Sequence, residues 1–76
     1  MIDIITKAKV AQSFSNRRDS LLLEGWRIVF ERSDKFGAFC KMSHRNGSVI
    51  ILTCDYENRQ VRQKTDGVVA HSETVC

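Results

Sequence analysis

Two side chains that can ligate zinc or form a thiol–base pair, Cys40 and His44, lie four positions apart in the sequence. The alternating pattern around them predicts a β-strand, and four residues of strand span about 13 Å. Zinc needs both ligand atoms within about 2.0–2.3 Å of the metal, so one strand cannot bring these two onto one ion. His71 and Cys76 add only two ligands near the C-terminus. We therefore expect no metal and no cofactor.

Catalytic groups form no recognisable constellation in the sequence. The strand spacing that separates Cys40 from His44 also keeps the thiol away from the imidazole, and nothing near Cys54 or His71 would activate either side chain. There is no phosphate-binding glycine loop and no nucleophile elbow. A chain of 76 residues also has little room for a closed pocket of about 300–1,000 Å³. The sequence predicts a protein that is not an enzyme.

The stretch DKFGAFCKMSHRNGSVIIL, residues 34–52, combines two phenylalanines with basic side chains. Its first part resembles the FGAFV strand of S1-type RNA-binding domains, and the resemblance to that family covers about residues 25–52. It also resembles the aromatic strand of the RNA recognition motif. Both resemblances imply RNA binding. The chain departs from the first family because too few residues follow to close a five-stranded barrel. It departs from the second because Phe36 and Phe39 are three positions apart and point to opposite faces of an unbroken strand.

The charge balance is mildly basic, with 12 Lys and Arg against 9 Asp and Glu and a net charge of +3. Nucleic-acid-binding proteins usually have a larger excess of cations or gather them on one face. If the chain binds nucleic acid or an acidic partner, the expected contacts are Arg17, Arg18, Lys41, Arg45, Arg59, Arg62 and Lys64.

The N-terminal part has a helical pattern over about residues 3–24, and Gly25 is placed to end the helix with a left-handed residue. The segment 15–20 contains Ser and Asn, which favour caps and turns, so a continuous helix and a broken one both remain open. The residues that recur at helical spacing are Val10, Phe14, Arg17 and Leu21.

From Trp26 the period changes to two, which predicts strands. Trp26, Ile28 and Phe30 alternate with residues 27, 29 and 31, which predicts a half-buried strand. Asn46-Gly47 predicts a hairpin with a two-residue type I′ turn, and Asp66-Gly67 a second one. The predicted strands span about residues 26–32, 36–45, 48–54, 60–65 and 68–72. The fold class is therefore α+β, a single domain over residues 1–76 with the N-terminal helix packed on one face of a small antiparallel sheet of three to five strands.

A two-residue turn fixes the register of the first hairpin and pairs Met42 with Ile51. That register puts Phe39, Ile50 and Leu52 on one face of the sheet. Because one helix can cover only one face, these three side chains should form an exposed apolar patch. We expect this patch to be a protein interface, closed by a target or by a second copy in a two-fold homodimer.

The chain has three cysteines, an odd number that cannot all pair within one molecule. The predicted register puts Cys40 opposite Thr53 and Cys54 opposite Phe39, so both should be reduced and buried. Cys76 should be exposed, and its role is open. No stretch has the length of a signal-peptide core or the roughly 20 apolar residues of a membrane span. The expected location is the cytoplasm, with no membrane contact.

Two functions remain. The leading hypothesis is a small interaction module that regulates or inhibits a partner protein by occluding it. In size and in its lack of proline the chain is similar to the small accessory proteins that phages and prophages encode against host enzymes. The alternative is a small protein that binds RNA or single-stranded DNA through basic residues of its sheet and helix. Steep salt dependence would identify the second.

Overall fold

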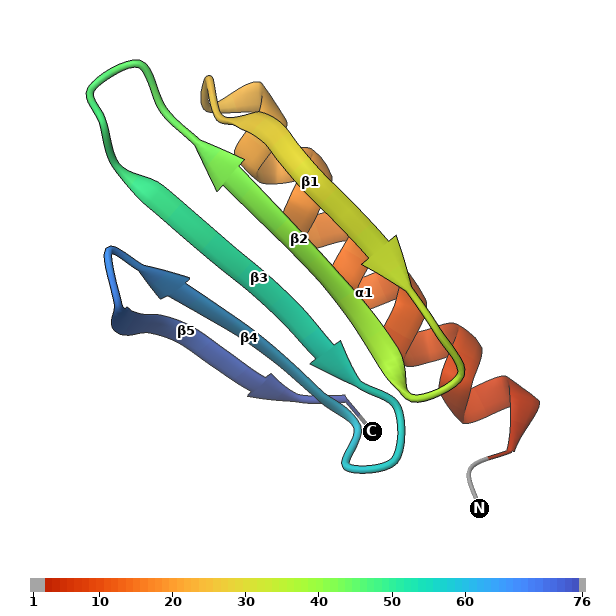
Figure 1. The fold of residues 1–76 in the computed structure, drawn as a ribbon. Coiled ribbons are helices and arrows are strands. Elements are labelled where there is room, and N and C mark those ends of the chain that lie inside the picture. The colour runs from red at the N-terminus through yellow and green to blue at the C-terminus, as the bar shows by residue number, and fades with distance from the viewer. Residues whose placement is uncertain (1–2, 76) are drawn as a thin grey trace.

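A computed structural model describes residues 3–75 as one helix followed by five strands. The elements are α1 (Ile4–Leu23), β1 (Arg27–Ser33), β2 (Gly37–Ser43), β3 (Val49–Asp55), β4 (Gln60–Thr65) and β5 (Val68–Thr74). Neighbouring strands in the chain pair antiparallel, so the sheet order is β1-β2-β3-β4-β5, and α1 packs on one face of this open sheet (Figure 1). The predicted α+β class is confirmed.

Helix α1 runs without a break through residues 15–20 and is capped at both ends. At its start, the Asp3 carboxylate accepts a hydrogen bond from the Thr6 N–H at 2.7 Å. At its end, Gly25 adopts a left-handed conformation, and the N–H groups of Gly25 and Trp26 donate to carbonyls of the last helical turn. The predicted helix end at Gly25 is therefore confirmed, and the chain turns directly into β1.

The core lies between α1 and the sheet. Val10, Phe14 and Leu21 form the buried stripe of the helix, as their spacing predicted. The sheet contributes alternate side chains of its three central strands, namely Cys40, Met42, Ile50, Leu52, Cys54 and Val61. Each apolar side chain removed from water here contributes about 25 cal/mol per Å² of apolar area, and this burial holds the two layers together.

The hairpin between β2 and β3 forms at Asn46-Gly47, but its loop is one residue longer than predicted. The Gly47 N–H donates to the His44 carbonyl at 2.9 Å, and the His44 N–H donates to the Ser48 carbonyl at 3.0 Å. Gly47 has a φ of 94°, whereas Asn46 is not in the left-handed region. This is a three-residue loop closed by a left-handed glycine. The predicted type I′ turn is wrong at this position.

The longer loop shifts the register by one residue. Met42 pairs with Ile50 and Cys40 pairs with Leu52. Because side chains alternate along a strand, this shift moves every side chain of β3 to the other face relative to β2. Ile50 and Leu52 are therefore 1% and 0% exposed beneath α1. The predicted exposed patch of Phe39, Ile50 and Leu52 is wrong, because only Phe39 lies on the uncovered face.

A substitution at Gly37, the first residue of β2, tests the pairing of β2 with β3. A Cβ atom added at Gly37 would overlap the carbonyl oxygen of Cys54 on β3, so Gly37→Ala should force the two strands apart. We expect a loss of about 1–3 kcal/mol or more in the free energy of unfolding. Gly47→Asn is the comparison, because nothing lies within 4 Å of the added Cβ; only the left-handed backbone opposes this change, which should cost less than Gly37→Ala. Chemical unfolding followed by circular dichroism measures both. Equal stability of Gly37→Ala and the parent would contradict this strand pairing.

Candidate functional site

The face of the sheet opposite α1 is covered by no other element of residues 3–75 (Figure 1). We call it the open face. Side chains that alternate with the buried ones point to it, and directly paired residues of neighbouring strands share a face. Two of its rows, read across the strands, are Arg32, Phe39, Thr53, Arg62 and Ser72, and Phe30, Lys41, Ile51, Lys64 and Val69.

A β-bulge in β1 decides which side chains of that strand reach the open face. The register shifts between Ile28 and Phe30, so that Val29 is an extra residue. Ile28 pairs with Met42, which is buried beneath α1, whereas Phe30 pairs with Lys41 on the open face. Without the bulge, Phe30 would lie on the same face as Ile28. The predicted unbroken alternation through this strand is therefore wrong.

An aromatic pair lies on the open face. The rings of Phe30 and Phe39 meet edge to face, with 6.0 Å between their centroids and 62° between their planes. Phe30 is 51% exposed, and Phe39 is half-buried between its neighbours. Phe36 lies in the loop before β2 and is not part of the pair. The two aromatic side chains thus come from adjacent strands and not from two positions of one strand.

Charge is segregated between the two faces of the sheet. All Lys and Arg residues within the strands lie on the open face: Arg27, Arg32, Lys41, Arg62 and Lys64. The one acidic strand residue there is Asp55. Glu31 and Glu73 pair with buried residues and therefore lie on the helix side. A modest net charge of +3 is in this way gathered into a strongly basic surface.

The predicted basic contacts divide into three groups. Lys41, Arg62 and Lys64 lie together on the open face. Arg45 and Arg59 are exposed in the β2–β3 and β3–β4 loops.

Arg17 and Arg18 lie on the helix side of the sheet and have partners within the chain. The Arg17 Nε donates to the Oε1 of buried Gln63 at 2.8 Å, which satisfies a polar group in the core. The Arg18 Nη1 donates to the Glu31 Oε2 at 2.9 Å, and this bond raises the pKa of Arg18. Both guanidiniums hold the helix to the sheet.

Sequence reasoning missed Arg27, Phe30 and Arg32 as residues of the site. For Phe30 and Arg32 the reason is the bulge, because an unbroken strand sends both side chains toward the helix. Arg27 precedes the bulge and lies on the face opposite to Ile28 in either case. The extra residue, Val29, is β-branched and fits a regular strand as well as a bulge. No residue type in this strand signals the bulge.

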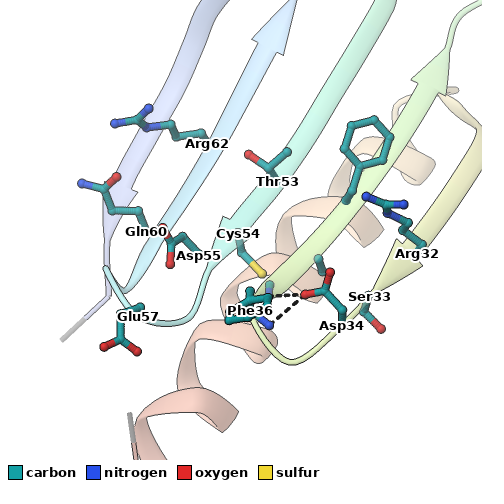
Figure 2. A pocket seen from close by; sticks show the side chains of 13 residues that line it. Arg32, Ser33, Asp34, Phe36, Thr53, Cys54, Asp55, Glu57, Gln60 and Arg62 are labelled. Atoms are coloured by element: carbon teal, nitrogen blue, oxygen red, sulfur yellow. Dashed lines mark hydrogen bonds between the residues drawn. The ribbon is translucent and has the colours of Figure 1, made fainter. Parts of the chain in front are cut away.

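A shallow basin of about 570 Å³ lies on the open face, at the end nearest the β1–β2 and β3–β4 loops. Figure 2 shows Arg32 and Arg62 on opposite sides of it with Thr53 between them. Neither guanidinium has a hydrogen-bond partner among residues 3–75. Two arginine side chains are therefore available to a ligand in the basin.

Carboxylates mark the loop end of the basin. The Asp34 Oδ1 accepts from the N–H groups of Phe36 and Gly37 at 2.8 and 3.1 Å (Figure 2). Asp55 accepts from the side chain and the backbone N–H of Asn58 at 2.7 and 3.1 Å. These two bonds, the side-chain one first, lower the pKa of Asp55. Its carboxylate is thus ionised at neutral pH.

The thiols lie on the other side of the sheet. Cys40 and Cys54 are free and buried, as predicted, although their partners are Leu52 and Ala38 because of the register shift. Burial raises the pKa of Cys40 to about 11 and also raises that of Cys54. A thiol with such a pKa is a poor nucleophile at neutral pH. Cys76 lies outside the described residues.

Within residues 3–75 no three His, Cys, Asp or Glu side chains converge in a way that could hold a metal ion. In the same part of the chain, no helix is both long and apolar enough to cross a membrane. The sheet is open, so the closed barrel implied by the resemblance to S1-type domains is not formed. Comparison with protein-family models, with curated proteins and with solved structures finds no match to this chain.

Thiol reactivity tests the placement of the cysteines. At pH 8, a pKa of about 11 leaves about one Cys40 in a thousand as thiolate, against roughly a quarter for an exposed cysteine with a pKa of about 8.5. In a Cys76→Ser variant, we expect iodoacetamide to modify Cys40 at least about a hundredfold more slowly in the folded protein than in guanidinium. Peptide mass spectrometry measures the rates. Rapid modification of folded Cys40 would contradict its burial under α1.

Proposed function

We propose that this chain is a non-catalytic binding protein whose open face takes single-stranded nucleic acid, RNA or DNA. The observation that carries the proposal is the joint presence of an exposed aromatic pair and five cations on one uncovered sheet face. Aromatic rings stack on bases and cations contact the backbone in proteins that bind single strands. A single residue type would support a weaker conclusion.

The aromatic pair favours a single strand over a duplex. Phe30 stands 51% exposed on the sheet beside Phe39, where a ring can contact the flat surface of a base. Bases in a duplex are stacked on each other and cannot lie on such a ring, whereas unpaired bases can. Lys41 and Arg32 pair directly with the two phenylalanines across β1 and β2. Arg62 and Lys64 continue the same two rows on β4, where the phosphates of the strand would run.

Charge argues against a second copy as the occupant of this face. Two open faces placed together by a two-fold axis would oppose five cations with five cations, and the counter-charges that line the basin, Asp34, Asp55 and Glu57, lie at its loop end. In an interface, bringing like charges together typically costs several kcal/mol of binding free energy. A second copy of the chain is therefore a less favourable binding partner for this face than a polyanion.

A second candidate is a regulator that occludes a partner protein. It is supported by the edge strand β1, where all seven residues are exposed and Val29 is 57% exposed. An exposed apolar edge can accept a further strand from a partner. The two candidates use different surfaces, the edge of β1 and the open face.

Charge reversal on the open face tests the proposal. For single strands, the logarithm of the affinity falls with the logarithm of salt by about 0.7 for each phosphate contact, so five contacts would give a slope of about −3.5. Lys41→Glu and Lys64→Glu should each weaken binding of a fluorescent oligonucleotide and reduce that slope by about 0.7. Titrations at several salt concentrations, read by fluorescence anisotropy, measure both quantities.

Lys9→Glu is the matched control, because Lys9 is exposed on α1 and the change in net charge is the same. It should leave the slope unchanged. Equal losses of affinity from Lys9→Glu and Lys41→Glu would show that only net charge matters and would contradict a binding site on the open face. A partner bound through the β1 edge would respond little to salt.

Truncation of the aromatic pair tests the stacking. Phe30→Ala removes a half-exposed ring and should weaken binding of the oligonucleotide about 5–100-fold, since each stacked base contributes about 1–3 kcal/mol. Leu23→Ala, at a 90% exposed position in the last turn of α1, is the control and should have no effect. An unchanged affinity for Phe30→Ala would remove the aromatic pair from the site.

A further inference from the structure

The open face changes its charge along the strands. The two rows that contain Arg32 and Lys41 carry four of the five cations, and Arg27 lies in the row beyond them. The next row toward the β3–β4 loop pairs Asp55 with Gln60 and contains no cation. The basin of about 570 Å³ spans this boundary, with Arg32 and Arg62 at its sides and Asp55 and Gln60 at its loop end (Figure 2).

The two arginines suit a phosphate group. They are three strands apart in one row, about 14 Å between their backbones at the usual strand spacing, and both side chains line the same basin. A guanidinium forms paired hydrogen bonds with phosphate oxygens. Neither has a hydrogen-bond partner among residues 3–75, although the charge of Arg62 acts on Asp55 and contributes to lowering the pKa of that carboxyl. The volume lies within the range of small-ligand sites.

The loop end of the basin suits a different group. The Asp55 carboxylate is an acceptor only, and its bonds to Asn58 lower its pKa and keep it ionised. Each carboxylate oxygen has a second lone-pair site left for a donor. The Gln60 side chain opposite it has no hydrogen-bond partner among the described residues and can donate or accept. This end therefore favours a ligand edge that presents an amino group and repels a phosphate.

Resting on the proposed function, we infer that the basin is a subsite for one nucleotide of the bound strand that prefers cytosine to uracil. The phosphate lies between Arg32 and Arg62, and the base edge faces Asp55 and Gln60. Cytosine presents an amino group at its position 4, which donates to a carboxylate. Uracil has a carbonyl oxygen at that position, which would face the ionised carboxylate without a proton between them.

The test compares fluorescent oligo(C) and oligo(U) of equal length, about eight nucleotides, at pH 7.5 and fixed salt, by anisotropy titration. The natural chain should bind oligo(C) at least about fivefold more tightly. Asp55→Asn should reduce this ratio to less than about twofold, because the amide can donate to the uracil oxygen. Asp66→Asn, at the turn at the far end of the sheet, should leave the ratio unchanged.

The outcomes separate the two proposals. Equal affinities of the natural chain for the two oligomers, or an unchanged ratio in Asp55→Asn, would overturn the cytosine subsite and leave the binding face intact. Failure to bind either oligomer would overturn the proposed function and the subsite with it. If circular dichroism shows that Asp55→Asn is unfolded, Asp55→Ser replaces it, since the hydroxyl can still accept from the Asn58 N–H and can donate to the uracil oxygen, so that the ratio should still fall.

Discussion

A single helix has to supply one whole side of the core of a five-stranded sheet. The stripe of Val10, Phe14 and Leu21 covers the central strands, and burial of this apolar surface is the main favourable term in a chain so short. The stripe is interrupted at Arg17, whose guanidinium reaches the buried amide of Gln63 and replaces an apolar contact by a satisfied polar one. The other face of the sheet is covered by no element of residues 3–75, and it carries cations beside apolar side chains such as Phe30 and Ile51.

This constraint explains the separation of charge. Cations cannot lie between helix and sheet without a partner, because an unpaired buried charge is too costly. The strand cations therefore all lie on the open face, while Arg18 reaches the helix side only as the partner of Glu31. Five cations on one surface repel each other, and an anionic ligand relieves that repulsion. The stability of the fold and the chemistry of its surface thus have the same origin.

The bulge at Val29 adds an aromatic surface to the basic open face. It turns Phe30 out of the helix side and against Phe39, so that an aromatic surface lies among the cations. As a result, the Phe30 ring is half-exposed on an edge strand and contributes less buried apolar surface to the core, which matters in a small domain. A bulge also twists an edge strand away from regular pairing, which reduces uncontrolled association at that edge.

The sequence by itself determined the class of fold, the helix with its buried stripe, its end at Gly25 and the existence of the Asn46-Gly47 hairpin. These follow from local patterns of period and from residues with strong backbone preferences. It also placed Lys41 on the same face as Phe39, since alternation within β2 is regular.

Only the tertiary structure decided which residues share a face. The loop after His44 has three residues instead of two, and β1 contains one extra residue. Each of these single-residue differences reverses the side of the sheet for a whole strand segment, because side chains alternate with a period of two. The local sequence allows either loop length and either form of β1. The choice belongs to the packing of Ile50 and Leu52 beneath the helix, which no local pattern contains.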